Sequence, residues 1–202
     1  MRPDYNKIAR VYDTLVFIVF GSTLDKARNT YLDQINEKNR VLIVGGGTGK
    51  IISQLDKLGL SLTVDFVDLS GNMIAIAKKR NQQNLTVAYH EVDILDYRDS
   101  SYDIVLCNFF LDQFSAQDVS LILNHLYTKL NPNGLFLYSD FQPSKNMLNQ
   151  VLMSAMYLFF RKTVKLKKII LSKHKIQFSE VGFRLNSTKR LRYNIYASVF
   201  IK

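Results

Sequence analysis

Two patterns of apolar and polar residues alternate along most of the chain, and each change of pattern marks the start of an expected element. Short runs that are apolar throughout, such as residues 41–44, are typical of strands buried on both faces of a parallel sheet. Between them, apolar residues recur at helical spacing, as in Val119, Ile122 and Leu126. Strict alternation of strands and helices predicts a parallel sheet with right-handed crossovers. The expected strands are residues 40–44, 62–67, 85–90, 102–108 and 135–140.

Several local signals define the expected helices. Apolar spacing predicts a helix near the N-terminus, and Ser22 followed by Asp25 resembles a capping box that opens a second helix through about residue 36. Ser115 opens the helix that follows the fourth strand, and the turn residues 131–134 end it. Residues 148–160 are apolar on nearly all sides of a helix, which is typical of burial, of a partner or of the wall of an apolar pocket. Two further helices are expected at residues 50–58 and 72–80.

A glycine-rich turn joins the first strand to the helix after it. Gly45, Gly46, Gly47, Thr48 and Gly49 follow the apolar run directly. Glycines allow the backbone to approach a ligand closely, and the first turn of a helix offers unpaired N–H groups. A strand, a glycine turn and a helix in this order indicate a nucleotide-binding α/β unit.

Spacing separates the ligands that such a turn can bind. A Walker phosphate loop would place a glycine at Val44 and a serine or threonine at Ile51, so a nucleoside triphosphate is not expected. A dinucleotide fingerprint would place its third small residue at Lys50. That side chain is too long for close packing of helix and strand, which weakens the dinucleotide hypothesis and leaves it open.

Five stretches in order resemble the motifs of class I S-adenosylmethionine (SAM)-dependent methyltransferases. They are VLIVGGGTG, VDFVDLSGNM, HEVDILDY, YDIVLCNFFLDQF and LNPNGLFLYSDF, and they cover roughly residues 38–141. The pattern Y-x-x-I-A-x-x-Y-D over residues 5–13 is similar to the opening of quinone and related small-molecule methyltransferases. Gly182 and Phe183 resemble the pair that precedes the last two strands of the family, expected here at 183–189 and 193–201.

The resemblance implies a doubly wound, Rossmann-like α/β fold in one domain. We expect a seven-stranded, mostly parallel sheet with an antiparallel C-terminal pair and helices on both faces. The resemblance divides the chain into a helical lid (1–38), a cofactor-binding core (39–141), an apolar and basic helical insertion (142–182) and the C-terminal strand pair (183–202).

The resemblance also implies SAM as the cofactor and assigns residues to it. Asp68 would accept hydrogen bonds from the ribose and Asp93 would contact the adenine amino group, while Asn108 and Phe109 would lie near the transferred methyl group. Tyr12 either closes over the cofactor or anchors its helix on the sheet. The full set of expected cofactor-binding residues is Tyr12, Gly45, Gly46, Gly47, Thr48, Gly49, Asp68, Leu69, Met73, Asp93, Ile94, Asn108 and Phe109.

One position departs from the family, because Ile43 stands where an acidic residue usually helps to hold the glycine loop and the methionine end of SAM. This leaves a non-catalytic SAM-fold binding protein as an alternative to an enzyme. No general base can be assigned. The candidates at strand ends or in the lid are Tyr5, Tyr12, Asp112, Tyr138 and Asp140.

The acceptor is expected to be small and partly apolar, such as a quinone or a lipid-like compound. Asn108-Phe109-Phe110-Leu111 shares only its asparagine with the N-P-P-[YF] motif of adenine methylases, which argues against methylation of RNA bases without excluding RNA as a substrate.

Charge and composition add three expectations. Residues 1–140 carry 14 basic and 16 acidic side chains, whereas residues 141–202 carry 13 basic side chains and one acidic. This basic third could bind an anionic membrane surface or nucleic acid, or could simply be a solvated face. The apolar runs are shorter than the roughly 20 residues of a spanning helix, so we expect a cytoplasmic protein, at most peripheral to a membrane. Cys107 is expected in the core, and no cluster of Cys and His suggests a metal.

Overall fold

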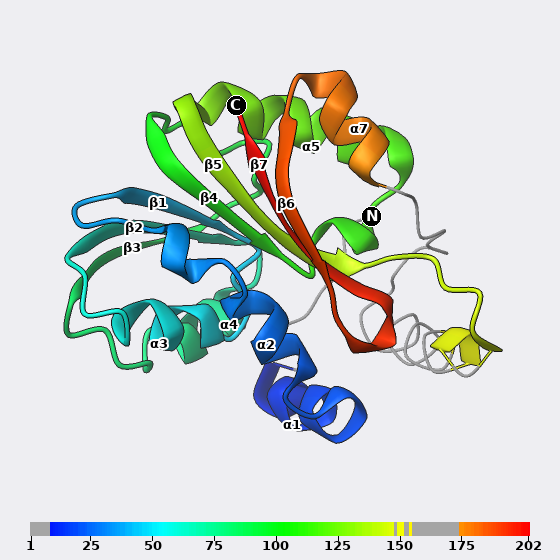
Figure 1. Ribbon diagram of the computed structural model, residues 1–202. Helices are drawn as coiled ribbons and strands as arrows, with labels where there is room; N and C mark the ends of the chain where they lie inside the picture. Colours follow the sequence, from blue (N-terminus) through cyan, green and yellow to red (C-terminus); the bar gives the residue numbers. More distant parts are fainter. Residues whose placement is uncertain (1–8, 148, 152–153, 155–173) are drawn as a thin grey trace.

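A twisted sheet with the strand order β3-β2-β1-β4-β5-β7-β6 forms the centre of the computed structural model, which describes residues 9–147, 149–151, 154 and 174–202 (Figure 1). The first five strands run parallel, and β7 runs antiparallel to β5 and β6. The strand order reverses between β1 and β4, which is where sheets of this type bind ligands. The strands are β1 (Arg40–Val44), β2 (Leu62–Asp68), β3 (Leu85–Glu91), β4 (Tyr102–Asn108), β5 (Leu130–Phe141), β6 (Arg184–Arg190) and β7 (Ile195–Ile201).

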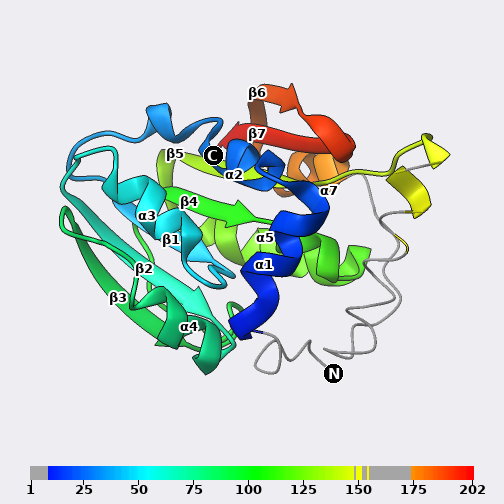
Figure 2. The same cartoon turned by 90° about the horizontal axis from the view of Figure 1, so that it is seen from below.

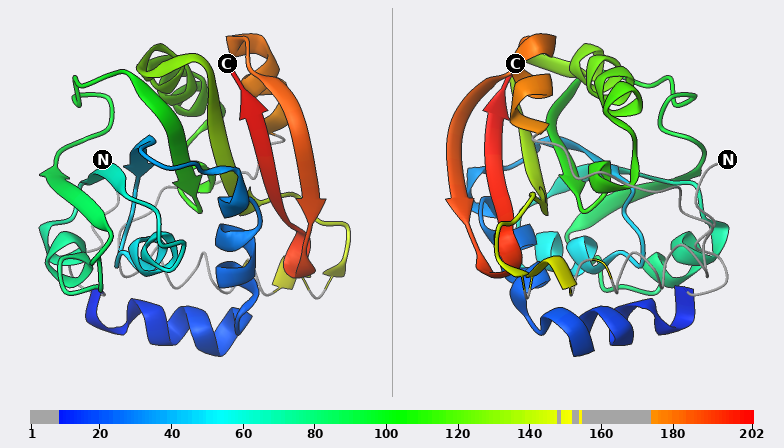
Figure 3. Two further views of the ribbon diagram at one scale, coloured as in Figure 1. Left: turned by 60° about the vertical axis from the view of Figure 1, so that its left-hand side comes forward. Right: turned by 90° about the vertical axis from the view of Figure 1, so that its right-hand side faces the viewer.

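Helices cover both faces of this sheet (Figure 3). They are α1 (Ala9–Phe20), α2 (Thr23–Asn29), α3 (Lys50–Asp56), α4 (Gly71–Ala77), α5 (Ala116–Lys129) and α7 (His174–Val181), with short 3-10 turns η2 (Leu32–Gln34), η3 (Leu111–Gln113) and η4 (Arg192–Asn194). None of the helices in the described residues is long and apolar enough to cross a membrane.

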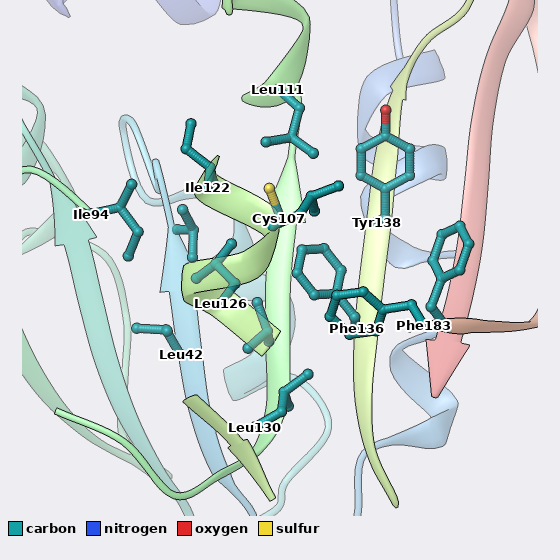
Figure 4. Packing of buried hydrophobic residues seen from close by; sticks show 14 of the residues in the cluster. Leu42, Ile94, Cys107, Leu111, Ile122, Leu126, Leu130, Phe136, Tyr138 and Phe183 are labelled. Atoms are coloured by element: carbon teal, nitrogen blue, oxygen red, sulfur yellow. The ribbon is translucent and has the colours of Figure 1, made fainter. Parts of the chain in front are cut away.

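The pleat of the strands divides the core into two layers. In β1, Leu42 and Val44 point to the cluster that contains α5 and α7, whereas Val41 and Ile43 point to the cluster that contains α3 and α4. Figure 4 shows the first of these clusters, in which Leu126 of α5 lies against the strands. A strand buried on both faces must be apolar on both, which explains why β1 has no polar alternation.

A third, smaller cluster attaches the N-terminal helices to the end of the sheet. Phe20 of α1 packs against Phe141 at the end of β5, and Ala27 of α2 packs in the same cluster with Phe109. The backbone carbonyl of Ala27 also accepts a hydrogen bond of 3.0 Å from the hydroxyl of Ser139. The segment expected to form a lid therefore lies beside the strand ends.

The expected fold class is confirmed, including the antiparallel C-terminal pair. Two local predictions were wrong. The second helix begins directly after Ser22 as expected, but the Ser22 side chain makes no capping hydrogen bond and the helix ends at Asn29. The chain then turns into η2, which places Leu32 and Ile35 in the core beside α3. The turn expected at residues 131–134 is assigned to β5, as an irregularity in its pairing with β4. Most of the predicted helix at 148–160, and residues 161–173 of the basic C-terminal third, lie outside the described residues.

Candidate functional site

A pocket opens at the carboxyl ends of β1, β2 and β4, at the point where the strand order reverses. The glycine turn forms its floor, the end of β2 one wall and the segment after β4 the other. This position agrees with the general rule for ligand sites in open α/β sheets. Its lining includes most of the residues expected from the sequence, namely Gly45, Gly46, Gly47, Thr48, Asp68, Leu69, Met73, Asp93, Ile94, Asn108 and Phe109.

The glycine turn is held in shape by Asp68 at the end of β2. The Gly47 backbone N–H donates to one carboxylate oxygen of Asp68 at 2.7 Å, and the Ser70 N–H donates to the other at 2.8 Å. Burial raises the pKa of Asp68, while these backbone donors oppose the rise. Gly45 and Gly47 have φ values of 61° and 57°, and a side chain at Gly47 would project into open space. The backbone at Gly47 is therefore accessible to a ligand in the pocket.

The residues after β2 and β3 form the end of the pocket that contains Asp68. Met73 is buried, and its N–H donates to the side chain of Ser70, which caps α4. Leu69 is exposed and lines the pocket. Asp93 accepts a hydrogen bond of 2.9 Å from the Leu95 N–H, so its carboxylate also stabilises the local turn. This end combines apolar walls with two carboxylates, as a nucleoside would require.

Aromatic side chains line the opposite wall, which the segment after β4 provides. Phe109 adopts a φ of 53°, and its N–H donates to the Ser139 carbonyl at 2.7 Å, so the chain turns sharply at the strand end. Phe110 and Phe114 pack with ring centroids 4.9 Å apart, and Gln113 Nε2 donates to the Phe109 carbonyl at 3.1 Å. Phe110, Gln113 and Phe114 were not among the predicted site residues. The aromatic residues that follow Asn108 in the sequence could have indicated an apolar wall here.

Two basic side chains, Arg28 and Lys50, are among the described residues that line the pocket. The Arg28 side chain is 11% exposed, pairs with Asp25 at 2.7 Å and lies 5.1 Å above the Phe109 ring. The Lys50 Nζ atom lies 3.8 Å from Oδ1 of Asp13. A guanidinium of this kind is suited to bind a carboxylate. Arg28 was not predicted from any motif, because it reaches the pocket from a separate helix.

Asp13 fastens α1 to the glycine turn. The Thr48 hydroxyl donates to one oxygen of Asp13 at 2.7 Å, and the Arg80 guanidinium donates to the other at 2.6 Å. Arg80 also donates from Nε to the Thr48 carbonyl at 2.9 Å. Figure 2 shows α1 crossing in front of the sheet beside α4. Helix α1 thus lies beside the glycine turn.

Sequence comparisons relate this fold to methyltransferases. A family model described as a methyltransferase domain matches residues 41–134, which include the glycine turn, β2 and β4. A demethylmenaquinone methyltransferase of Leptospira interrogans is 30% identical over 72% of this chain and 62% of its own length. The expected resemblance to class I SAM-dependent methyltransferases is confirmed over residues 41–134. A malonyl-acyl-carrier-protein O-methyltransferase of Bacillus cereus is also similar, at 35% identity over 50% of this chain and 37% of the relative. The chain thus spans less than two thirds of the length of either relative.

Solved structures share the fold of this chain. In a complex of the Haloferax volcanii Trm112 methyltransferase activator with a methyltransferase, the matching chain has a TM-score of 0.75 at 14% identity, over 100% of this chain and 98% of that one. A Burkholderia thailandensis 1,6-didemethyltoxoflavin-N1-methyltransferase with bound substrate and S-adenosylhomocysteine has a TM-score of 0.68 at 14% identity, over 96% and 84% of the two chains.

The pocket fits SAM, the cofactor of these methyltransferases. The open space beside Gly47 leaves room for a ligand against the backbone, and Asp68 faces the same pocket. Apolar residues Met73 and Ile94 lie where a planar base could pack. Among the described residues, no side chain fills the space beside Gly47. A pocket filled by the protein's own side chains would have ruled out the cofactor.

Other predicted residues lie elsewhere in the structure. Gly49 begins α3 with a φ of 72° and packs against Ala77 of α4, and it is not among the residues lining the pocket. Ile43 lines the pocket with a buried apolar side chain. The Tyr12 side chain and all of Tyr5 lie outside the described part of the structure.

The remaining base candidates are buried away from the pocket. Asp112, Tyr138 and Asp140 are at most 6% exposed and are not among the residues lining the pocket. Burial raises the pKa values of Tyr138 and Asp140 well above their ordinary values. Cys107 is fully buried in the core as expected, and its thiol pKa is likewise raised by burial.

Proposed function

We propose that this chain transfers the methyl group of SAM to a small, largely apolar acceptor. The observation that carries the proposal is the division of the pocket into two chemically different parts. One part has the glycine turn and the carboxylates Asp68 and Asp93, and the other has the rings of Phe109, Phe110 and Phe114. A nucleoside suits the first part and a flat apolar molecule suits the second.

Within this proposal, the charged residues orient the cofactor. Asp68 accepts hydrogen bonds from the ribose, with an oxygen geometry already fixed by Gly47 and Ser70. Asp93 accepts from the adenine amino group. Arg28 pairs with the carboxylate at the methionine end, where Ile43 offers no charge.

When bound, SAM supplies an electrophilic methyl group on a positively charged sulfur. The acceptor's lone pair forms the new bond to the methyl carbon while the electron pair of the carbon–sulfur bond moves to the sulfur. The task of this chain is to align the two reactants and exclude water, and such orientation is worth about 7–11 kcal/mol. Among the described pocket residues, the carboxylates Asp68 and Asp93 are assigned to the nucleoside. An acceptor that needs no protein base therefore fits this site best. A carboxylate is already ionised at neutral pH, whereas a quinol, whose phenol-like hydroxyl has a pKa of about 10, would release its proton to water as the methyl group is transferred.

The similarity to a demethylmenaquinone methyltransferase supports a quinone-like acceptor, and the similarity to a malonyl-acyl-carrier-protein O-methyltransferase supports a carboxylate. The test is release of S-adenosylhomocysteine (SAH) from SAM with three probes, namely a short-chain 1,4-naphthoquinol, a malonyl thioester and a structured RNA. We expect turnover with one of the two small probes and none with Asp68→Ala. Turnover with RNA and with neither small probe would contradict the proposed acceptor class and favour RNA methylation.

Ile43 favours a second function, in which the chain binds SAM without transferring its methyl group. Its buried side chain occupies the position of the family's usual acid and leaves the methionine end of the cofactor without that partner. Calorimetry separates the two functions from a failure of the site. SAM binding without turnover of any probe would favour the binding protein, whereas no binding at millimolar SAM would refute both.

A further inference from the structure

Asp140 at the end of β5 is a fully buried acidic residue that the proposed chemistry does not use. One of its oxygens accepts a hydrogen bond of 3.1 Å from the backbone N–H of Asp112, and the other accepts one of 2.9 Å from the N–H of Phe141. The backbone of Leu111 and the side chain of Tyr138 also hydrogen-bond to it. The carboxyl group of Asp140 thus joins the end of β5 to the first two residues of η3.

The segment that Asp140 holds is the aromatic wall of the pocket. Phe109 and Phe110 precede η3, and Gln113 and Phe114 end it and follow it. A second connection from β5 is the hydrogen bond from the Phe109 N–H to the Ser139 carbonyl. Successive residues of one strand therefore hold the beginning and the middle of this wall.

The surroundings of Asp140 keep its hydrogen bonds fixed. Leu111 packs with Cys107 and Tyr138 in the cluster on the α5 face, and Figure 4 shows the three side chains on the same side of the sheet. Burial, and secondarily the nearby Asp112 carboxylate, raise the pKa of Asp140 well above its ordinary value. Losing a buried side-chain acceptor of backbone N–H groups is costly, because without access to water these N–H groups have no replacement partner.

We propose that Asp140 is a positioning residue that sets the acceptor side of the site by anchoring η3, without contacting cofactor or acceptor. This inference rests on the proposed function, in which Phe109, Phe110 and Phe114 hold the acceptor. It predicts that the two parts of the pocket respond separately to a change at Asp140. The cofactor part is built on β1 and β2, which Asp140 does not contact through any of the hydrogen bonds above.

Asp140→Asn is the test variant, since it keeps the size of the side chain and replaces one accepting oxygen with an amide nitrogen that cannot accept. Ser198→Ala is the control, because it removes a buried side-chain hydrogen bond, the 2.8 Å contact with Thr188 of β6, that does not involve η3. Ser198 is the β7 partner of Tyr138, so the control reports a loss of stability in the same part of the sheet without a change in the hydrogen bonds to η3. If Asp140→Asn does not fold, Asp140→Glu supplies the second variant. It retains the carboxylate but displaces it by one methylene.

Three measurements on the full chain decide the proposal. Calorimetry with SAH should give a Kd within about twofold of wild type for both variants. Binding of 1,4-naphthoquinone to the SAH complex should weaken by about tenfold or more in Asp140→Asn and remain unchanged in Ser198→Ala. Hydrogen exchange should become faster in the peptide covering residues 109–114 in Asp140→Asn, and not in the control.

Each result has a consequence. Equal loss of SAH and naphthoquinone affinity, or unchanged exchange at residues 109–114, would overturn the positioning role. If wild type with SAH does not bind naphthoquinone, the quinone-like acceptor is refuted, and the exchange experiment still decides whether Asp140 anchors η3. Where a probe is turned over, Asp140→Asn should raise the KM for that probe more than the KM for SAM, and equal changes in both would argue against the proposal.

Discussion

Replacing Arg28 with methionine tests the orientation of the cofactor most directly. The change keeps the length and apolar packing of the side chain, which lies against the Phe109 ring, and removes the guanidinium from the pocket. We expect weaker binding of SAH, which has a carboxylate, and unchanged binding of methylthioadenosine, which has the same nucleoside and no amino-acid part. The comparison isolates the charge at one end of the ligand.

The structure sets the size of the effect. Two opposite charges 4 Å apart interact by about 4 kcal/mol at an effective dielectric constant of 20. Arg28 is already paired with Asp25 at 2.7 Å, so part of this attraction is spent within the protein. A hydrogen bond to a charged group typically contributes about 1.5–3 kcal/mol, which corresponds to about a 10- to 150-fold increase in the Kd for SAH. The Asp25 carboxylate left behind repels the ligand carboxylate and favours the upper part of that range.

The assay is calorimetry with both ligands, and Lys26→Met provides the control. Lys26 is an exposed basic residue in the same helix, so its replacement makes the same change in net charge away from the pocket. The control should bind both ligands as wild type does. If Arg28→Met weakens SAH and methylthioadenosine by the same factor, or weakens neither, Arg28 does not bind the carboxylate and the cofactor orientation proposed above is wrong.

Three further substitutions test other parts of the structure. Asp68→Ala should raise the Kd for SAH by about a hundredfold or more, because the two proposed ribose hydrogen bonds lose their charged acceptor and the Gly47 N–H loses its partner in the glycine turn. An unchanged Kd in calorimetry would show that the ribose lies elsewhere. Tyr102→Phe should lower the free energy of unfolding by about 1–3 kcal/mol, because it removes the 2.9 Å donor to buried Asp65. The folded-state pKa of Asp65 is depressed below its ordinary 3.8, so this stabilisation is present above that value and is lost at lower pH; urea unfolding should therefore show a smaller difference between variant and wild type at about pH 3 than at about pH 7. Gly45→Ala should lower the thermal stability for two reasons: the new Cβ would overlap the Phe110 ring, and the backbone φ of 61° is strained for alanine. Adding Phe110→Leu should recover only the stability lost to the overlap. Full recovery would show that backbone strain at Gly45 is unimportant.

Local pattern was sufficient to predict the parallel strands, whereas the antiparallel C-terminal pair was expected from the family resemblance. The strand at Tyr102–Asn108 was predicted to the residue, because the apolar run at residues 104–107 stands between polar segments. The end of α2 was not, since the helix is interrupted by the need to bury Leu32 and Ile35 rather than by a local stop signal. Residues 131–134 have the composition of a turn, and Asn133 has a φ of 62°. They nevertheless belong to β5, where they form an irregularity in its pairing with β4.

The candidate site was predictable where its residues follow strand ends directly, and elsewhere it was not. The glycine turn, Asp68 and Asn108 come from motifs that a linear sequence displays. The contacts of Asp13 with Arg80 join residues 67 positions apart, and Arg28 enters the pocket from a helix whose place depends on the third hydrophobic cluster. Such residues are recognised by where the fold brings them, and no spacing rule in the sequence identifies them.

The tip of β5 has a consequence for how such a site can change. Ser139 and Asp140 are neighbours, yet because strand side chains alternate, the first points toward α2 and the second toward η3. A single peptide unit thus serves as a fixed spacer between the helix bearing Arg28 and the loop bearing the aromatic rings. Selection for a new acceptor can therefore reshape the ring-bearing loop while this spacer keeps the distance between the two walls constant.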